Sequence, residues 1–228
     1  SDNLIQDDYD DGEYSWWRTD QNGKIFQNKI KNVNGRYYAF DGLGRMQTGF
    51  VLFDTRSTFV AQYDMDAWSS EDFIEGNIYG IEKADLYFFS PDELNDGSMQ
   101  TGFQNVGGKK YYFGTDGKMA VGWRLVDGRY YYLDNEGKMK TGWQQIDGGW
   151  YFLSPEGKLR VGWQQIDGSW YYLGEDGKMR TGWQQVKGLW YYLGQDGKML
   201  TGWQKIHNEY YYLYTDGRML TGWLNDNT

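Results

Sequence analysis

Residues 162–173 read GWQQIDGSWYYL, and this stretch decides the fold. Asp167-Gly168 stands between two short segments that mix aromatic and polar residues. Asp-Gly in this setting is the strongest short-range signal for a β-hairpin, since both turn residues must adopt positive φ. Two isolated strands cannot bury Trp163, Trp170 and the tyrosines that follow, because a lone hairpin is marginal in water. These rings must therefore find partners outside their own hairpin.

The stretch is one copy of a repeat. An aromatic residue directly after a glycine recurs every 20 residues, at Phe103, Trp123, Trp143, Trp163, Trp183, Trp203 and Trp223. Each unit continues with a two-residue turn, an aromatic segment such as WYYL and a loop resembling DGKM. Such a period is typical of proteins in which each unit packs on its neighbours. The sequence therefore predicts an all-β fold, a solenoid of stacked β-hairpins with about 20 residues per repeat.

Divergent copies of the same unit occur in the amino half. Residues 29–50 fit the repeat without gaps, with Ile30 in the place of Trp123 and Phe50 in the place of Trp143. Residues 86–103 fit after about three extra residues are allowed before Gly97. We therefore expect an acidic tail over residues 1–14, a divergent repeat module over 15–100 with a non-repeating insert at about 51–77, and a consensus module over 101–228.

Composition excludes several classes of protein. The chain has no Cys, so neither a disulfide framework nor thiolate chemistry is expected. No run of eighteen apolar residues is present, so no membrane insertion is expected. Residues 1–100 carry 19 Asp and Glu against 8 Lys and Arg, and residues 101–228 carry 13 against 15. This balance disfavours nucleic acid as a partner and is compatible with a cationic ligand.

Strand alternation predicts where the rings gather. If Asp147-Gly148 is the turn, Trp143 and Trp150 lie on one face of the hairpin, and Tyr171 of the next hairpin closes a three-walled aromatic cage. The same two offsets along the sequence define four such sets: Trp123, Tyr130 and Tyr151; Trp143, Trp150 and Tyr171; Trp163, Trp170 and Tyr191; Trp183, Trp190 and Tyr211. The set that begins at Phe103 has Lys110 in the middle place and should fail. Trp203 and Tyr210 have no following hairpin.

An aromatic cage without charged partners favours a weakly hydrated cation, and quaternary ammonium is the best case. Choline is therefore the predicted ligand of the tryptophan-based sets. One tyrosine per repeat is expected to serve ordinary packing instead, at Tyr132, Tyr172, Tyr192 and Tyr212.

The units GWQQIDGGWYFLSPEGKLRV, GWQQIDGSWYYLGEDGKMRT and GWQQVKGLWYYLGQDGKMLT resemble the choline-binding repeats of pneumococcal surface proteins and of bacterial and phage cell-wall lysins. The resemblance implies a left-handed superhelical stack that binds phosphocholine on teichoic and lipoteichoic acids. It also implies a secreted protein on the cell wall of a Gram-positive bacterium, and a homodimer formed through the last repeats. A methionine often forms a fourth wall in that family. Met139, Met179 and Met199 are candidates, and each equally fits a gap-filling role.

The sequence thus predicts a non-catalytic wall-anchored protein without a cofactor. Ile30 and Phe50 replace tryptophan, and Ser57 stands seven residues after Phe50, so the amino half should not hold choline. That half is expected to act instead as an adhesin, binding a host protein, or as a modulator of a wall hydrolase. Two alternatives stay open: the wall-targeting module of a lysin whose catalytic domain is absent here, and a glucan-binding or other carbohydrate-binding repeat protein, since residues 108–113 read GKKYYF.

Catalytic and metal sites are not predicted. His207 is the only histidine and occupies a turn position. Two groups of carboxylates could in principle hold calcium or a glycosidase pair, but the first lacks the spacing of a calcium loop and the second lies in the insert without a scaffold. They are Asp7, Asp8, Asp10, Asp11 and Glu13, and then Asp64, Asp66, Glu71, Asp72 and Glu75.

Overall fold

The computed structural model describes residues 4–8, 14–63, 84–91 and 97–223, and every regular element in these ranges is a β-strand. The prediction of an all-β fold is confirmed. The chain forms two compact units, one of residues 1–124 with 132–139 and the other of residues 125–131 with 140–228.

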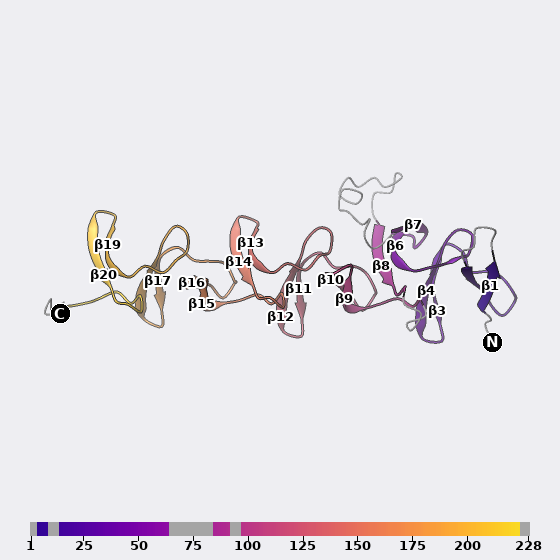
Figure 1. Ribbon diagram of the computed structural model, residues 1–228, viewed down its shortest axis with the longest axis horizontal. Helices are drawn as coiled ribbons and strands as arrows, with labels where there is room; N and C mark the ends of the chain where they lie inside the picture. Colours follow the sequence, from indigo (N-terminus) through magenta and orange to yellow (C-terminus); the bar gives the residue numbers. More distant parts are fainter. Residues whose placement is uncertain (1–3, 9–13, 64–83, 92–96, 224–228) are drawn as a thin grey trace. The chain divides into compact units, whose positions relative to one another are not determined.

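Antiparallel two-stranded hairpins follow one another along the consensus part of the chain (Figure 1). Their strands are β9 (Gly102–Val106) with β10 (Lys109–Phe113), β11 (Gly122–Val126) with β12 (Arg129–Leu133), β13 (Gly142–Ile146) with β14 (Gly149–Leu153), β15 (Gly162–Ile166) with β16 (Ser169–Leu173), β17 (Gly182–Val186) with β18 (Leu189–Leu193), and β19 (Gly202–Ile206) with β20 (Glu209–Leu213). Each strand has five residues, so each 20-residue repeat is one hairpin and one loop.

The predicted register of these hairpins is confirmed. In the β13–β14 hairpin, Trp143 lies opposite Phe152 and Gln145 lies opposite Trp150. The turn residues Asp147 and Gly148 have φ of 48° and 74°, the left-handed values that a two-residue hairpin turn requires. Along β14, the buried side chains are Tyr151 and Leu153, two residues apart, while Trp150 is exposed on the opposite face.

Neighbouring hairpins of the second unit are joined through the main chain. The N–H of Met179, in the loop after one hairpin, donates to the carbonyl oxygen of Trp150 in the preceding hairpin at 2.7 Å. The same bond recurs from Met199 to Trp170 and from Met219 to Trp190, each at 2.7 Å. Because backbone groups form this bond, the bond can recur whatever side chains stand at those positions.

One leucine of each repeat lies in the core of the stack. The side chains of Leu153, Leu173, Leu193 and Leu213 are 0% exposed. Each follows the aromatic residues of the second strand of its hairpin, so the aromatic strand supplies both the core and the rings on the opposite face.

The first unit begins with two further hairpins. Strand β1 (Leu4–Asp8) pairs with β2 (Tyr14–Arg18), so part of the segment expected to be an acidic tail, residues 1–14, is a strand. Strand β3 (Lys29–Val33) pairs with β4 (Arg36–Phe40), and β4 also pairs with β5 (Met46–Gln47). Ile30 lies opposite Ala39 and Asn32 opposite Tyr37, which is the register of the consensus hairpins.

A third hairpin in this unit contains the insertion. Strand β6 (Gly49–Asp54) pairs with β8 (Ala84–Phe89), with Phe50 opposite Phe88 and Leu52 opposite Leu86. This is again the consensus register, so residues 54–84 stand where other repeats have a two-residue turn. Strand β7 (Phe59–Tyr63) of the inserted segment pairs with the other edge of β6. The insert therefore begins at the end of a repeat strand, after residue 53, rather than at residue 51.

The lengthened turn corrects two expectations. The residue that corresponds to Trp150 in this repeat is Leu86, not Ser57, because the offset of seven residues holds only for a two-residue turn. The loop after β8 is also longer: Phe89 bridges to Met99 ten residues on, whereas Phe113 bridges to Met119 six residues on. The loop thus has four extra residues, against about three expected from the sequence.

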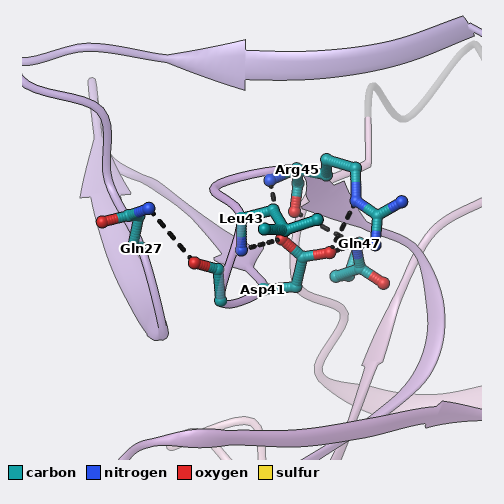
Figure 2. Close-up of polar contacts among 6 residues, drawn as sticks. Gln27, Asp41, Leu43, Arg45 and Gln47 are labelled. Carbon is teal, nitrogen blue, oxygen red and sulfur yellow. Dashed lines mark hydrogen bonds and ion pairs between the residues drawn. The ribbon is translucent and has the colours of Figure 1, made fainter. Parts of the chain in front are cut away.

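The loop after β4 is held by a buried carboxylate (Figure 2). Asp41 is 4% exposed, and its Oδ1 accepts hydrogen bonds from the backbone N–H groups of Leu43 and Arg45 at 2.9 and 2.8 Å. Its Oδ2 accepts from Nε of Arg45 at 2.9 Å and from Nε2 of Gln47 at 3.1 Å. Nε2 of Gln27 donates to the carbonyl oxygen of Gly42 at 3.1 Å, which ties the segment before β3 to this loop.

Candidate functional site

Aromatic rings from two successive hairpins meet in the second unit. The ring centroid of Trp143 lies 4.9 Å from that of Tyr171 in the next hairpin and 6.5 Å from that of Trp150 in its own hairpin. The planes cross at 64° and 82°, so the rings form walls rather than a stack. Tyr171 is 9% exposed, whereas Trp150 is 42% exposed. The three rings therefore form a group in which Tyr171 is buried and Trp150 is open to solvent.

The inner pair of rings recurs in the next two repeats with nearly the same dimensions. Trp163 lies 4.8 Å from Tyr191, and Trp183 lies 4.8 Å from Tyr211, with interplanar angles of 62° and 66°. Trp190 lies 6.3 Å from Trp183 at 88°. The outer tryptophans are again accessible, since Trp170 is 41% and Trp190 is 40% exposed. The register and the 20-residue period place these rings, because every repeat has the same hairpin and the same junction.

A further ring supports each inner tryptophan from its own hairpin. Trp143 packs on Phe152 at 5.2 Å, Trp163 on Tyr172 at 5.1 Å and Trp183 on Tyr192 at 5.1 Å. These partners lie directly opposite the tryptophans in the strand register. Tyr172 and Tyr192 thus make the packing contacts expected of them, and they support the inner tryptophan of each set.

The fourth predicted set, Trp123, Tyr130 and Tyr151, is divided between the two units. Within the first unit, Trp123 packs on Tyr132 at 5.0 Å. Within the second unit, Tyr130 is 50% exposed and Tyr151 is 8% exposed, which is the pattern of Trp150 and Tyr171.

The position expected to fail has a positive charge over its ring. Nζ of Lys110 lies 4.8 Å from the ring centroid of Phe103, and Tyr112 packs on the same ring at 4.9 Å. In the consensus repeats an aromatic ring stands where Lys110 stands. An ammonium group over this face repels a second cation, which supports the expectation that this repeat binds none.

The methionine side chains pack between successive loops. A Cβ placed on Gly197 would meet Sδ of Met179 at less than contact distance, and a Cβ on Gly217 would meet Sδ of Met199 in the same way. Leu159 occupies the corresponding place against Gly177, at 2.8 Å from such a Cβ. Packing against the next loop is therefore sufficient to explain why Leu159, Met179 and Met199 are apolar. For Met139 the structure gives the main-chain bond from its N–H to the carbonyl oxygen of Lys110, at 2.7 Å.

The first unit contains a closed version of the aromatic group. Phe50 lies 5.2 Å from Tyr111 with an interplanar angle of 65°, nearly the geometry of Trp143 and Tyr171. The third wall is Leu86, which is 2% exposed, and Phe50 and Tyr111 are 0% and 2% exposed. Burial raises the pKa of the Tyr111 hydroxyl above its ordinary value. The same junction that leaves an open group between consensus repeats is here part of the hydrophobic core.

The last hairpin leaves its rings exposed. Trp203 is 63% and Tyr210 is 68% exposed, and Trp223 is 100% exposed. Nζ of Lys205 lies 5.4 Å from the ring centroid of Tyr210.

The described residues contain few of the alternative site candidates. His207 lies in an exposed turn with a φ of 50°. The carboxylates of the insert from Asp64 to Glu75 lie outside the described residues, as do Asp10, Asp11 and Glu13. Sequence reasoning missed two features: the packing of methionine against glycine in the next loop, and a cavity lined by lysines between residues 20 and 31.

A family model described as a choline-binding repeat matches residues 100–141, 140–179, 160–201, 180–221 and 200–228, which together are more than half of the chain. The chain belongs to the choline-binding repeat family. The junctions between its choline-binding repeats are therefore the places at which the aromatic groups described above recur.

Solved structures of choline-binding proteins share the fold of this chain. CbpF in complex with ipratropium is 30% identical with a TM-score of 0.70, over 92% of this chain and 64% of that one. Choline binding protein F from Streptococcus pneumoniae in a second crystal form is 29% identical with a TM-score of 0.60, over 98% and 81%. CbpJ from Streptococcus pneumoniae TIGR4 is 25% identical with a TM-score of 0.60, over 99% and 90%. The chain thus spans 64% of the length of the first of these proteins.

A comparison with curated protein sequences finds no match. In the ranges that the structure describes, no helix has the length and apolar character needed to cross a bilayer.

Proposed function

We propose that the aromatic groups at the repeat junctions bind choline, and that the chain is a non-catalytic protein anchored to phosphocholine on teichoic and lipoteichoic acids. The observation that carries this proposal is the repetition of one geometry. Three junctions each have two rings in contact at 4.8–4.9 Å and an outer tryptophan that is 40–42% exposed. Packing alone does not require a large ring to stay open to solvent at three successive junctions. A ligand that covers these faces explains the repetition.

Binding strength follows from the number of sites. A desolvated cation over aromatic faces gains about 2 kcal/mol, and with apolar contact one site reaches a free energy of about 4 kcal/mol, which is a Kd near 1 mM. A polymer with many phosphocholines contacts several sites at once, and linked sites raise the overall affinity about a hundredfold or more. Such avidity suffices to hold a protein on the cell wall of a Gram-positive bacterium without a covalent link.

Choline titration tests the proposal. Tryptophan fluorescence and calorimetry should show saturable binding, and Trp143→Ala, Trp163→Ala and Trp183→Ala should each remove part of the stoichiometry. Trp223→Ala is the matched control, because Trp223 is fully exposed and lies outside the three groups. The uncharged isostere 3,3-dimethylbutanol should bind much more weakly if the positive charge matters. Response to glucan oligomers but not to choline would replace this function with carbohydrate binding.

We propose for the amino half a separate role as an adhesin or as a modulator of a wall hydrolase. Residues 1–100 carry 19 acidic against 8 basic residues, and their aromatic junction at Phe50 is closed. The sequence of this half is therefore acidic, and its closed junction does not offer a choline site. The full chain and a chain that starts at residue 101 should bind choline alike. They should differ in binding to host matrix proteins or in their effect on a purified wall hydrolase, and equal behaviour in both assays would contradict this role.

The exposed rings of the last hairpin also support a homodimer through the carboxyl-terminal repeats. Trp203 and Tyr210 are 63% and 68% exposed, more than any ring of the three aromatic groups between consensus repeats. Sedimentation equilibrium should show a dimer that is weakened by the double variant Trp203→Ala and Tyr210→Ala. A monomer at all concentrations, with and without choline, would contradict this assembly.

A further inference from the structure

A cavity of about 390 Å³ lies in the first unit, and none of its lining residues belongs to the aromatic junctions of the second. Its lining includes Asp20, Lys24, Ile25, Phe26, Lys29 and Lys31. The three lysines of the lining are exposed, so this cavity is open to solvent.

The cavity gathers positive charge in an acidic part of the sequence. Residues 1–100 have only 8 Lys and Arg, and three of them line this one cavity. Among the described residues of the lining, Asp20 is the one carboxylate, and its Oδ1 already accepts hydrogen bonds from the backbone N–H groups of Asn22 and Lys24 at 2.9 and 3.0 Å. The lining therefore has a formal excess of two positive charges, set against a surrounding sequence whose net charge is negative.

The main chain around the cavity is held in place on both sides. Lys29 and Lys31 are two residues apart on β3, so their side chains project from the same face. The N–H of Phe26 donates to the carbonyl oxygen of Arg18 at 3.0 Å, and the ring of Phe26 packs 5.8 Å from that of the buried Phe40. The hydrogen bond from Nε2 of Gln27 to the carbonyl oxygen of Gly42 ties the segment between Phe26 and Lys29 to the loop after β4 (Figure 2). The lysines thus extend from a fixed frame.

Lys31 has a weak internal partner. Its Nζ lies 5.3 Å from the ring centroid of Phe26. The ammonium group of an exposed lysine is held only weakly by a half-buried ring, so an anion that enters the cavity can draw it away from the ring.

We propose that this cavity binds the phosphate group of a phosphate-bearing ligand, such as a polyol phosphate. Lysine ammonium groups act as mobile point charges and suit the oxygens of a phosphate, which accept several hydrogen bonds at once. A ligand with a single carboxylate has only two oxygens and would leave more of the positive charge of the lysines uncompensated. The inference does not rest on the choline sites, because the lysines and the aromatic junctions are separate groups of residues.

Titration of the full chain with glycerol 3-phosphate tests the proposal. NMR spectra should show a saturable shift of the Phe26 ring protons as Lys31 leaves the ring. The triple variant Lys24→Gln, Lys29→Gln and Lys31→Gln should weaken binding at least tenfold. The matched control removes three exposed cations elsewhere, by Lys109→Gln, Arg129→Gln and Lys158→Gln, and should bind like the parent chain. Inorganic phosphate distinguishes a site for free phosphate, which it fills equally well, from a site for a polyol phosphate, which it fills more weakly.

Three results would overturn the proposal: an unchanged Phe26 signal, equal weakening in the two triple variants, or acetate binding as strongly as glycerol 3-phosphate. Choline titration of the same samples keeps the two functions apart. The cavity variant should retain full choline binding, and Trp143→Ala, which removes part of the choline stoichiometry, should leave the glycerol 3-phosphate response intact.

Discussion

Alanine at Gly197 should destabilise its repeat more than alanine at Gly202. Both glycines have left-handed backbone, with φ of 79° and 72°, so a Cβ costs about 1–2 kcal/mol at either position. The surroundings differ. A Cβ on Gly202 would have no heavy atom within 4 Å, whereas one on Gly197 would lie 2.8 Å from Cε and 2.9 Å from Cγ of Met179 and closer still to its Sδ.

Overpacking of this kind costs about 1–3 kcal/mol, and the flexible methionine favours the lower end of that range. Gly197→Ala should therefore lower the free energy of unfolding by about 2–4 kcal/mol, against about 1–2 kcal/mol for Gly202→Ala. Hydrogen exchange of the Met199 amide, which bonds to the carbonyl oxygen of Trp170, reports on this junction locally. A difference of about 1.4 kcal/mol between the two variants appears as a tenfold difference in its exchange rate.

A double-mutant cycle with Met179→Ala isolates the steric part of the effect. The double variant of Met179 and Gly197 should be less destabilised than the sum of the two single changes, because truncation of the methionine removes the clash. Equal exchange rates in the Gly197 and Gly202 variants, or strict additivity in the cycle, would refute the reasoning that Met179 fills the space above Gly197.

Three other changes have definite expected results. Leu173→Ala should cost about 2–5 kcal/mol in urea unfolding because the side chain is 0% exposed, whereas Leu125→Ala, at 59% exposed, should cost less than about 1 kcal/mol. Asp41→Asn should lower the free energy of unfolding by about 1–3 kcal/mol. Asn keeps an acceptor for the backbone N–H groups but turns an N–H donor toward the donors of Arg45 and Gln47. Asp54→Asn alters a more open loop and should lower the free energy of unfolding by less in the same urea assay. Burial raises the pKa of Tyr87 and Tyr111 in the folded chain, so these groups ionise first in the unfolded chain as the pH rises through 10. The stability of the folded chain should therefore be fully present below that pH and fall above it. Urea midpoints measured over an alkaline pH series should fall less steeply for Tyr111→Phe.

The consensus half shows how much the sequence could predict. A Gly-aromatic pair every 20 residues and Asp-Gly at the turn are sufficient to set the hairpin, its register and the face on which Trp143 and Trp150 lie. The approach of Tyr171 to Trp143 followed from stacking identical units, and the two rings do lie 4.9 Å apart. These features could be predicted because they depend on local geometry that repeats.

Features that depend on contacts outside the repeat could not be predicted in this way. The whole insert separates Phe50 from its partner Phe88 in the sequence. The offset of seven residues from Phe50 therefore gives Ser57, whereas the residue that corresponds to Trp150 is Leu86. The contact of Met179 with the next loop needs the distance between loops, which the sequence does not state. The lysines of the cavity come from a loop and a strand and form no motif.

The β6–β8 hairpin shows how this architecture can be enlarged. Residues 54–84 stand in the place of two turn residues, yet the N–H of Met119 still donates to the carbonyl oxygen of Leu86 at 2.7 Å, as at the shorter hairpins. The entropy of closing a loop grows only with the logarithm of its length, so this extension costs about 2 kcal/mol. Evolution can therefore graft a new segment onto the tip of any single repeat without rebuilding its neighbours, and the tight turns at Asp147, Asp167 and Lys187 are natural positions for an engineered display loop.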